Sequence, residues 1–185
     1  MNETATRSGA LPLVAIGAGA VVSLLLGVYG AQHEPTFEDI TTFGFPTLTA
    51  MKVWLAVAAG VMAVGQVFGA LWLYGKLPVS PPSWLGLGHR LSGFVAIALT
   101  LPVAYHCLWS LGFQDYDTRV LVHSIAGCVL YGAFVIKVFG VHGRTTPGWF
   151  LPFAGSLLFT VLLVAVLTSA GWYLGEFGLP DDPAY

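Results

Sequence analysis

Hydrophobic and polar positions alternate along this chain in long blocks rather than with a short period. Five apolar runs, each close to the roughly 20 residues that a bilayer-spanning helix needs, are separated by short polar connectors. We expect membrane-spanning helices at approximately residues 11–29, 53–74, 91–111, 120–141 and 149–174. The pattern therefore predicts an all-α, integral membrane, five-helix transmembrane bundle that occupies residues 1–185 as a single domain.

The composition agrees with this class. Hydrophobic residues make up 56% of the 185 residues and charged residues 9%, whereas a soluble domain carries about 25% charged residues. The polar surface of a water-soluble protein is therefore missing. We expect membrane lipid around the chain, and nothing in the sequence indicates a nucleic-acid partner.

Basic residues gather on one predicted side of the membrane and acidic residues on the other. The basic side holds Arg7, Lys76, Arg90, Lys137 and Arg144. The acidic side holds Glu34, Glu38, Asp39, Asp115, Asp117, Glu176, Asp181 and Asp182, and the exceptions are Glu3, Lys52 and Arg119. Because cytoplasmic loops are enriched in Lys and Arg, we expect a cytoplasmic N-terminus and an extracytoplasmic C-terminus, in a bacterial cell (plasma) membrane.

Four of the five histidines lie at the ends of the third and fourth predicted spans: His89, His106, His123 and His142. His89 and His123 each open the same pattern, His-x-[Leu/Ile]-[Ser/Ala]-Gly-x-Val. Imidazoles are scarce in hydrocarbon because an unsatisfied polar group there is costly. Each one is therefore a candidate functional residue. His33 lies in a polar connector, and we interpret it as a surface residue.

The four histidines form two pairs by predicted depth. His89 and His142 lie on the inner side, and His106 and His123 lie on the outer side. His106 follows His89 by 17 residues and His142 follows His123 by 19, which separates the two levels by roughly 25–28 Å of helix. Two imidazoles at one depth on two helices suit bis-histidine ligation of haem iron. We therefore expect two haem b groups with these four histidines as axial ligands.

Small residues near the histidines leave room for a flat ring. Gly93 and Gly127 each follow a histidine by four residues and so share its helix face. A side chain at either position would collide with a porphyrin bound by that histidine. Ala96 and Gly132 are expected to leave further room.

Three arginines are candidates for neutralising haem propionates through charge-assisted hydrogen bonds: Arg90, Arg119 and Arg144. Pro102 lies four residues before His106 and should bend that helix. Seventeen residues place His89 and His106 about 100° apart around an ideal helix. Either the bend at Pro102 corrects this difference, or the two haems lie on different sides of the helix pair.

The run His89-Arg90-Leu91-Ser92-Gly93 with His106, followed by His123-x-x-x-Gly127 and His142, resembles the transmembrane b-type cytochromes of the cytochrome b561 and ferric-reductase-like group. The resemblance covers the third and fourth spans, about a third of the chain. It implies two haems b at two membrane levels and electron transfer across the bilayer between quinol, ascorbate or NAD(P)H and an acceptor. The histidine spacings are longer than in many related proteins, and a flavin or nicotinamide motif is missing. We therefore expect an electron-transfer subunit rather than a complete reductase.

The function expected from these residues is that of a b-type cytochrome subunit of a respiratory chain. It would carry electrons between a quinone pool or a cytoplasmic-side donor and an extracytoplasmic iron–sulfur, copper or haem protein. Oxidoreductase activity toward quinol or quinone would arise only within a larger complex. The acidic connector at residues 31–49 is the expected docking surface for the outer partner.

Three alternatives remain open. The histidines could lie in the headgroup zone, bonded to water or loops, in a haem-free membrane anchor that holds a peripheral redox complex and could itself bind quinone. The acidic connector could be a solvated loop that only helps to set topology. A metal or solute carrier is less well supported, because the spans contain no carboxylate.

Overall fold

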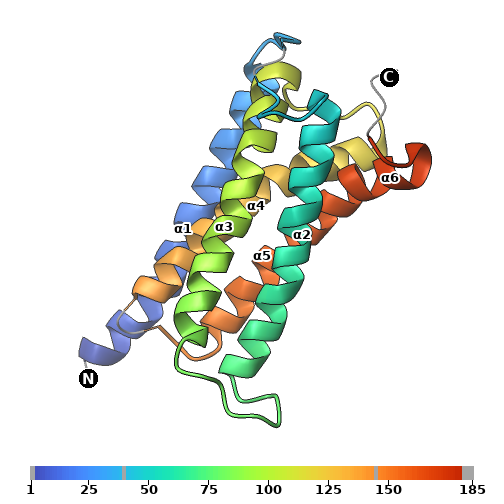
Figure 1. Ribbon diagram of the computed structural model, residues 1–185. Coiled ribbons are helices and arrows are strands. Elements are labelled where there is room, and N and C mark those ends of the chain that lie inside the picture. The colour runs from blue at the N-terminus through green and yellow to red at the C-terminus, as the bar shows by residue number, and fades with distance from the viewer. Residues whose placement is uncertain (1–2, 39–40, 144–145, 181–185) are drawn as a thin grey trace. The chain divides into compact units, whose positions relative to one another are not determined.

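The computed structural model describes residues 3–38, 41–143 and 146–180, with side chains from residue 10 onward. Its helices are α1 (Glu3–Gln32), α2 (Leu48–Leu73), α3 (Leu85–His106), α4 (Thr118–His142), α5 (Phe150–Val166) and α6 (Trp172–Phe177) (Figure 1). Two π-helical turns continue these helices. The turn η1 (Cys107–Leu111) follows α3, and η2 (Leu167–Gly171) joins α5 to α6. The described residues contain no strand.

Five helical stretches are long and apolar enough to cross a membrane: Ala10–Gln32, Leu48–Leu73, Leu85–Leu111, Thr118–His142 and Phe150–Phe177. Large apolar side chains cover their outer faces; Leu24 and Phe94, for example, are each 66% exposed. Such exposure is unfavourable in water but not in lipid. The prediction of an all-α protein with five transmembrane helices is confirmed, and the chain is a multi-pass membrane protein.

The helices extend beyond the predicted spans because polar residues continue them. The helix α2 begins at Leu48, ahead of Lys52, and α3 begins at Leu85, so that His89 lies inside α3 rather than before it. Several residues used for the charge pattern lie outside the described residues: Asp39, Arg144, Asp181, Asp182 and the side chains of Glu3 and Arg7. The orientation across the membrane therefore stays a prediction.

The chain divides into two compact units. The first contains residues 1–34 and 112–165, hence α1, α4 and nearly all of α5. The second contains residues 35–111 and 166–185, hence α2, α3, η1, η2 and α6. The prediction of one domain over residues 1–185 stays a prediction.

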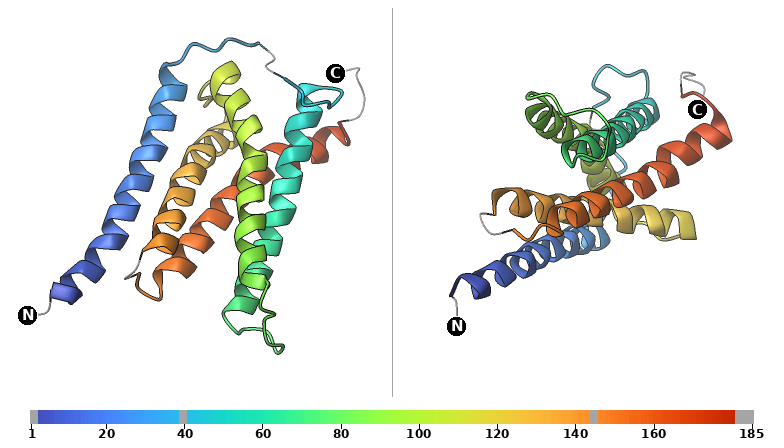
Figure 2. Two further views of the ribbon diagram at one scale, coloured as in Figure 1. Left: turned by 60° about the vertical axis from the view of Figure 1, so that its left-hand side comes forward. Right: turned by 90° about the horizontal axis from the view of Figure 1, so that it is seen from below.

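In the first unit, α1 and α4 pack closely along small residues, and they lie side by side in both views of Figure 2. An ideal Cβ built at Gly19 would lie 2.5 Å from the carbonyl oxygen of Gly132 and 2.5 Å from Cγ1 of Ile136. A Cβ at Gly132 would contact Oγ of Ser23 and the carbonyl of Gly19. Gly132 was expected to leave room for a ring, but its space is filled by α1, so that expectation is wrong.

This α1–α4 interface repeats small residues every fourth position of α1: Ala15, Gly19, Ser23 and Gly27. Between lipid-embedded helices, apolar transfer provides little driving force, so close backbone packing carries the association. The helix α5 completes the core of the unit, where Phe150 and Ala154 are fully buried against Ala15 and Ile136. Gly140 makes this possible, because a Cβ there would lie 2.9 Å from Cε1 of Phe150.

In the second unit, α2 packs on α3 (Figure 2) through a more polar contact. The side-chain Nε2 of Gln66 donates to Oγ of Ser92 over 2.7 Å, and this hydroxyl donates to the carbonyl of Gly88, also over 2.7 Å. Gly69 on α2 faces His89, and Gly93 on α3 faces Gln66. These residues define the α2–α3 interface.

The ends of α2 are fixed by side-chain hydrogen bonds. At its start, Oγ1 of Thr47 accepts from the backbone N–H of Ala50 over 3.0 Å, which satisfies one of the open amide groups of the first turn. At its other end, Nε1 of Trp72 donates to the carbonyl of Val79 over 2.7 Å. This second bond holds the connector between α2 and α3 against the end of α2.

Candidate functional site

The four candidate histidines are divided equally between the units. His89 is the fifth residue of α3 and His106 its last, whereas His123 is the sixth residue of α4 and His142 its last. Within each unit the two histidines therefore lie at opposite ends of one helix and do not share a site. In the part of the chain that the structure describes, no three His, Cys, Asp or Glu residues are grouped to hold a metal ion. Haem iron needs only two protein ligands, so this finding leaves the proposed axial ligands untested.

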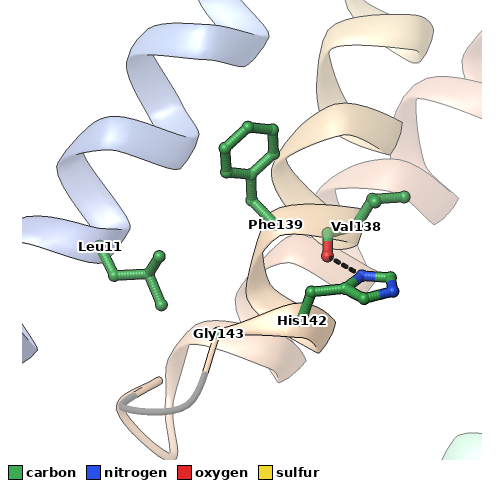
Figure 3. A pocket seen from close by; sticks show the side chains of 5 residues that line it. All are labelled: Leu11, Val138, Phe139, His142 and Gly143. Atoms are coloured by element: carbon green, nitrogen blue, oxygen red, sulfur yellow. Dashed lines mark hydrogen bonds between the residues drawn. The ribbon is translucent and has the colours of Figure 1, made fainter.

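His142 has a defined imidazole orientation at the end of α4. Its Nδ1 lies 2.9 Å from the carbonyl oxygen of Val138 (Figure 3). A carbonyl oxygen can only accept, so Nδ1 is the donor, and Nε2 is the nitrogen with the lone pair when the ring is neutral. This carbonyl lies four residues earlier, on the same face of α4 as the imidazole. The same tautomer is the one that a metal-binding imidazole needs.

A cavity of about 270 Å³ lies beside His142. It is lined by Leu11, Val138, Phe139, His142 and Gly143 (Figure 3). Because Gly143 has no Cβ, the side chain of Leu11 can lie directly against it at one wall of the cavity. The cavity is smaller than the roughly 300–1,000 Å³ typical of ligand pockets. It therefore offers an apolar wall next to one imidazole rather than a complete binding site.

His123 is held by a bond between two helices of the same unit. Its Nδ1 lies 3.1 Å from the carbonyl oxygen of Ala165 on α5, 42 residues away in sequence. Because this acceptor is again a carbonyl, Nδ1 is the donor, and Nε2 has the lone pair when the ring is neutral. Both histidines of α4 therefore have the tautomer expected of an iron ligand.

His89 lies against α2 in the second unit. An ideal Cβ at Gly69 would lie 3.0 Å from Nδ1 of His89, closer than most Cβ contacts, so the glycine favours the close approach of the ring to α2. One turn earlier on α2 is Gln66, whose Oε1 is buried and accepts no hydrogen bond from the described residues. Gln66 is not among the residues that the histidine pattern predicts. The signal was present, since Gln66 is the one side-chain amide within the five predicted spans.

His106 is the most buried of the four, with 3% of its surface exposed. The helix α3 continues through Pro102 as far as His106, and the π-helical turn η1 begins at the next residue. A π turn widens the helix and often marks a functional position. One carbonyl of η1 has a partner in the connector between α1 and α2: the backbone N–H of Phe37 donates to the carbonyl oxygen of Ser110 over 3.1 Å. The sequence predicted a bend from proline but not the π turn, which has no simple sequence signature.

The two glycines of the shared His-x-x-x-Gly pattern have different surroundings. An ideal Cβ at Gly93 would lie 2.8 Å from Oε1 of Gln66, so helix packing alone accounts for this glycine. At Gly127, the structure places no atom within 4 Å of an added Cβ. The space expected for a ring is therefore open beside Gly127 and filled beside Gly93. Their assignment to cofactor binding stays a prediction.

The arginines predicted to bind propionates are placed as follows. Arg90 is exposed at the start of α3. Arg119 lies in the first turn of α4, with Nη2 3.7 Å from Oδ2 of Asp117. Arg144 lies outside the described residues. The Arg119–Asp117 pair is solvent-accessible and hence weak, so Arg119 can exchange this partner at little cost.

A comparison with protein-family models decides what the chain is related to. The model described as "Family of unknown function (DUF6529)" matches residues 11–181, a range that covers every predicted span and all four candidate histidines. The chain belongs to this family. No curated protein and no solved structure matches the chain. The family therefore assigns no chemistry, and the function has to be argued from the residues.

Proposed function

We propose that this protein is a membrane-embedded b-type cytochrome subunit with two bis-histidine haems b. The axial ligands are His89 with His142 and His106 with His123, a pairing drawn from the positions of these residues along their helices. The observation that carries the proposal is the orientation of the α4 imidazoles. Nδ1 of His123 and of His142 each donates to a backbone carbonyl, which leaves the Nε2 lone pair for a metal.

Haem b, when bound with two imidazoles, supplies a one-electron carrier without an open coordination position. The chain itself has to fix the imidazoles, exclude water and compensate the propionate charges. The Nδ1 bonds to Val138 and Ala165 fix two of the rings. The open space at Gly127 suits a flat ring beside His123. Exposed Arg90, together with Arg119 and Arg144, suits the propionates.

The proposed route of the electrons follows from the expected topology. With a cytoplasmic N-terminus in a bacterial plasma membrane, the inner haem would exchange electrons with a quinone or a cytoplasmic-side donor. The outer haem would exchange them with an extracytoplasmic iron–sulfur, copper or haem protein. Glu34 and Glu38, both exposed on the connector before α2, provide acidic groups for docking such a partner. This arrangement makes the chain a subunit of a respiratory complex, in which any quinol or quinone chemistry would take place.

The experiment that tests the proposal is a dithionite-reduced minus oxidised absorbance spectrum of the detergent-purified protein. Haem per chain is then quantified as the pyridine complex. We expect two haems b per chain. One haem would mean that one histidine pair is structural, and no haem in a well-folded preparation would contradict the cytochrome function.

Single substitutions test the pairing. His89→Ala and His142→Ala should each remove the same haem, and His106→Ala and His123→Ala should each remove the other. His33→Ala is the matched control, because His33 stacks on Tyr29 with ring centroids 5.0 Å apart and belongs to neither pair. Loss of both haems from one substitution, with folding intact, would contradict pairing by depth.

A haem-free membrane anchor for a peripheral redox complex is the second candidate. The observation that favours it is the filled space beside Gly93, where Gln66 lies in place of a ring. An anchor would need its histidines only as helix-to-helix hydrogen-bond donors, as His123 is to Ala165. It predicts that the wild-type protein and all four alanine variants are folded and colourless.

A further inference from the structure

We infer that Gln66 is a positioning residue for His89, whose Nδ1–H donates to Oε1 of Gln66 when Nε2 binds haem iron. The inference rests on the proposed function, because it concerns the environment of a proposed ligand. It goes further by assigning a role to a residue on α2, a helix that carries none of the four histidines.

The other histidines show what kind of partner His89 requires. His142, at the end of α4, uses a carbonyl from its own last turn. His123, near the start of α4, instead uses a carbonyl of the neighbouring helix α5. The His123 bond shows that an imidazole near the start of a helix can take its acceptor from the helix packed beside it. His89 lies near the start of α3, and its neighbour in the unit is α2.

The α2 face beside His89 offers this acceptor. Gly69 brings the backbone of α2 against the imidazole, with Nδ1 of His89 3.0 Å from an ideal Cβ at that glycine. Gln66 precedes Gly69 by three residues and lies on the same helix face. Gly93, four residues after His89, makes the space that the Gln66 amide occupies. Two glycines, one on each helix, thus bring the amide and the imidazole to the same part of the α2–α3 interface.

The hydrogen bonds of Ser92 settle which end of the amide is the acceptor. The Ser92 hydroxyl donates its single proton to the carbonyl of Gly88 over 2.7 Å. It must therefore accept from Nε2 of Gln66, also over 2.7 Å. This leaves Oε1 as a buried acceptor to which no described residue donates. An amide oxygen in such a position is expected to have a donor, and an imidazole N–H supplies one.

The role has a measurable consequence. An acceptor on Nδ1 makes the imidazole a stronger electron donor and so favours ferric over ferrous iron. Removing the acceptor should shift the ferric–ferrous equilibrium of one haem toward the ferrous form by about tenfold, which is ~59 mV for a one-electron couple. The affected haem should be the one that His89→Ala removes. The other haem should keep its potential.

The test is a potentiometric titration of the purified holoprotein for Gln66→Leu, Gln66→Met and Ser92→Ala. Leu and Met keep an apolar volume but remove Oε1, and the two variants guard against a folding failure in either one. Ser92→Ala removes the bond that orients the amide but leaves Oε1 in place, so it should shift the potential less than loss of Oε1 does. We expect one potential to rise most, or that one haem to be lost, in Gln66→Leu and Gln66→Met. Gln66→Glu, which keeps and strengthens the acceptor, should move the same potential downward.

Unchanged potentials in the folded Gln66 variants would overturn the inference. So would equal shifts in Gln66→Leu and Ser92→Ala, because Gln66 would then act only as a helix-to-helix contact. Haem content of the wild-type protein, measured first, distinguishes failure of the proposed function from failure of the role of Gln66. Absence of haem in the wild type overturns the proposed function itself, whereas two haems with unresponsive potentials overturn only the role of Gln66.

Discussion

The α1–α4 interface of the first unit and the α2–α3 interface of the second join apolar helices by different means. Along α1 and α4, glycine backbones touch: Gly19 and Gly132 lie so close that neither could carry a methyl group. Along α2 and α3, glycines instead make room for polar side chains, the amide of Gln66 and the imidazole of His89. The first contact is made of backbone, and the second is made of side chains that can move.

The difference lies in which groups each interface buries. A backbone-to-backbone contact cannot adjust, so it fixes helix distance but offers no group for binding or proton exchange. A side-chain contact with buried polar atoms costs free energy in lipid unless each polar atom has a hydrogen-bond partner. Such a contact beside His89 is what the role proposed for Gln66 requires. The following predictions test this contrast.

The largest effect is expected from a methyl group placed in the α1–α4 interface. Gly19→Ala would place a Cβ 2.5 Å from the carbonyl oxygen of Gly132, whereas at Gly17, two residues away, nothing lies within 4 Å of an added Cβ. Both substitutions gain the same helix propensity. We expect Gly19→Ala to be about 2–3 kcal/mol less stable than Gly17→Ala. Unfolding in mixed detergent micelles would measure the difference, and equal stabilities would mean that the backbones are not in contact.

The helix caps should matter equally in both units. Thr47 accepts from the N–H of Ala50 at the start of α2 over 3.0 Å, and Oδ1 of Asp117 accepts from the N–H of Val120 at the start of α4 over 2.7 Å. Thr47→Ala and Asp117→Ala should each cost about 1 kcal/mol. Thr47→Ser and Asp117→Ser are the controls, and both should restore most of the stability. A large loss of stability from only one of the two alanine substitutions would show that the units differ in their helix ends as well as in their interfaces.

The paired glycines of the His-x-x-x-Gly pattern should respond unequally. Gly93→Ala brings a Cβ to 2.8 Å from Oε1 of Gln66, a side chain that can shift, whereas Gly127→Ala meets nothing within 4 Å. We expect Gly93→Ala to be about 1 kcal/mol less stable than Gly127→Ala. For the bulkier Gly127→Leu, the cytochrome proposal expects loss of a haem from a protein that still folds. Equal stability of the two alanine variants would argue against close packing of α2 on α3.

The smallest effect is expected for the hydrogen bond between Gln66 and Ser92. A double-mutant cycle with Gln66→Leu and Ser92→Ala should give a coupling free energy of about 0.6 kcal/mol, as is usual for interhelical hydrogen bonds in membranes. The same unfolding measurement as for Gly19 applies. A coupling of several kcal/mol would make the α2–α3 interface as rigid as the α1–α4 interface, and the contrast between them would fail.

Much of the fold could be predicted from the sequence, and the failures are instructive. The five spans depend on apolar residues adjacent in the chain, so their number and approximate places were predicted. The start of α3 was missed because Gly86 and Gly88 do not favour helix. Gly132 was assigned to the wrong neighbour, because its partner Gly19 is more than a hundred residues away. The π turns after His106 and Val166 were not predicted, since they arise from packing rather than from a residue type.

The sequence by itself determined the class of protein and the positions of four histidines along two helices. Both follow from sums and spacings over neighbouring residues, which the chain carries locally. Only the tertiary structure decided which carbonyl holds each imidazole, as Ala165 does for His123 across 42 residues. It also decided that Gln66 lies at Gly93 and that Gly69 faces His89. A hydrogen bond depends on the alignment of distant backbones to within a few tenths of an ångström, and hydrophobicity along the chain does not encode that alignment.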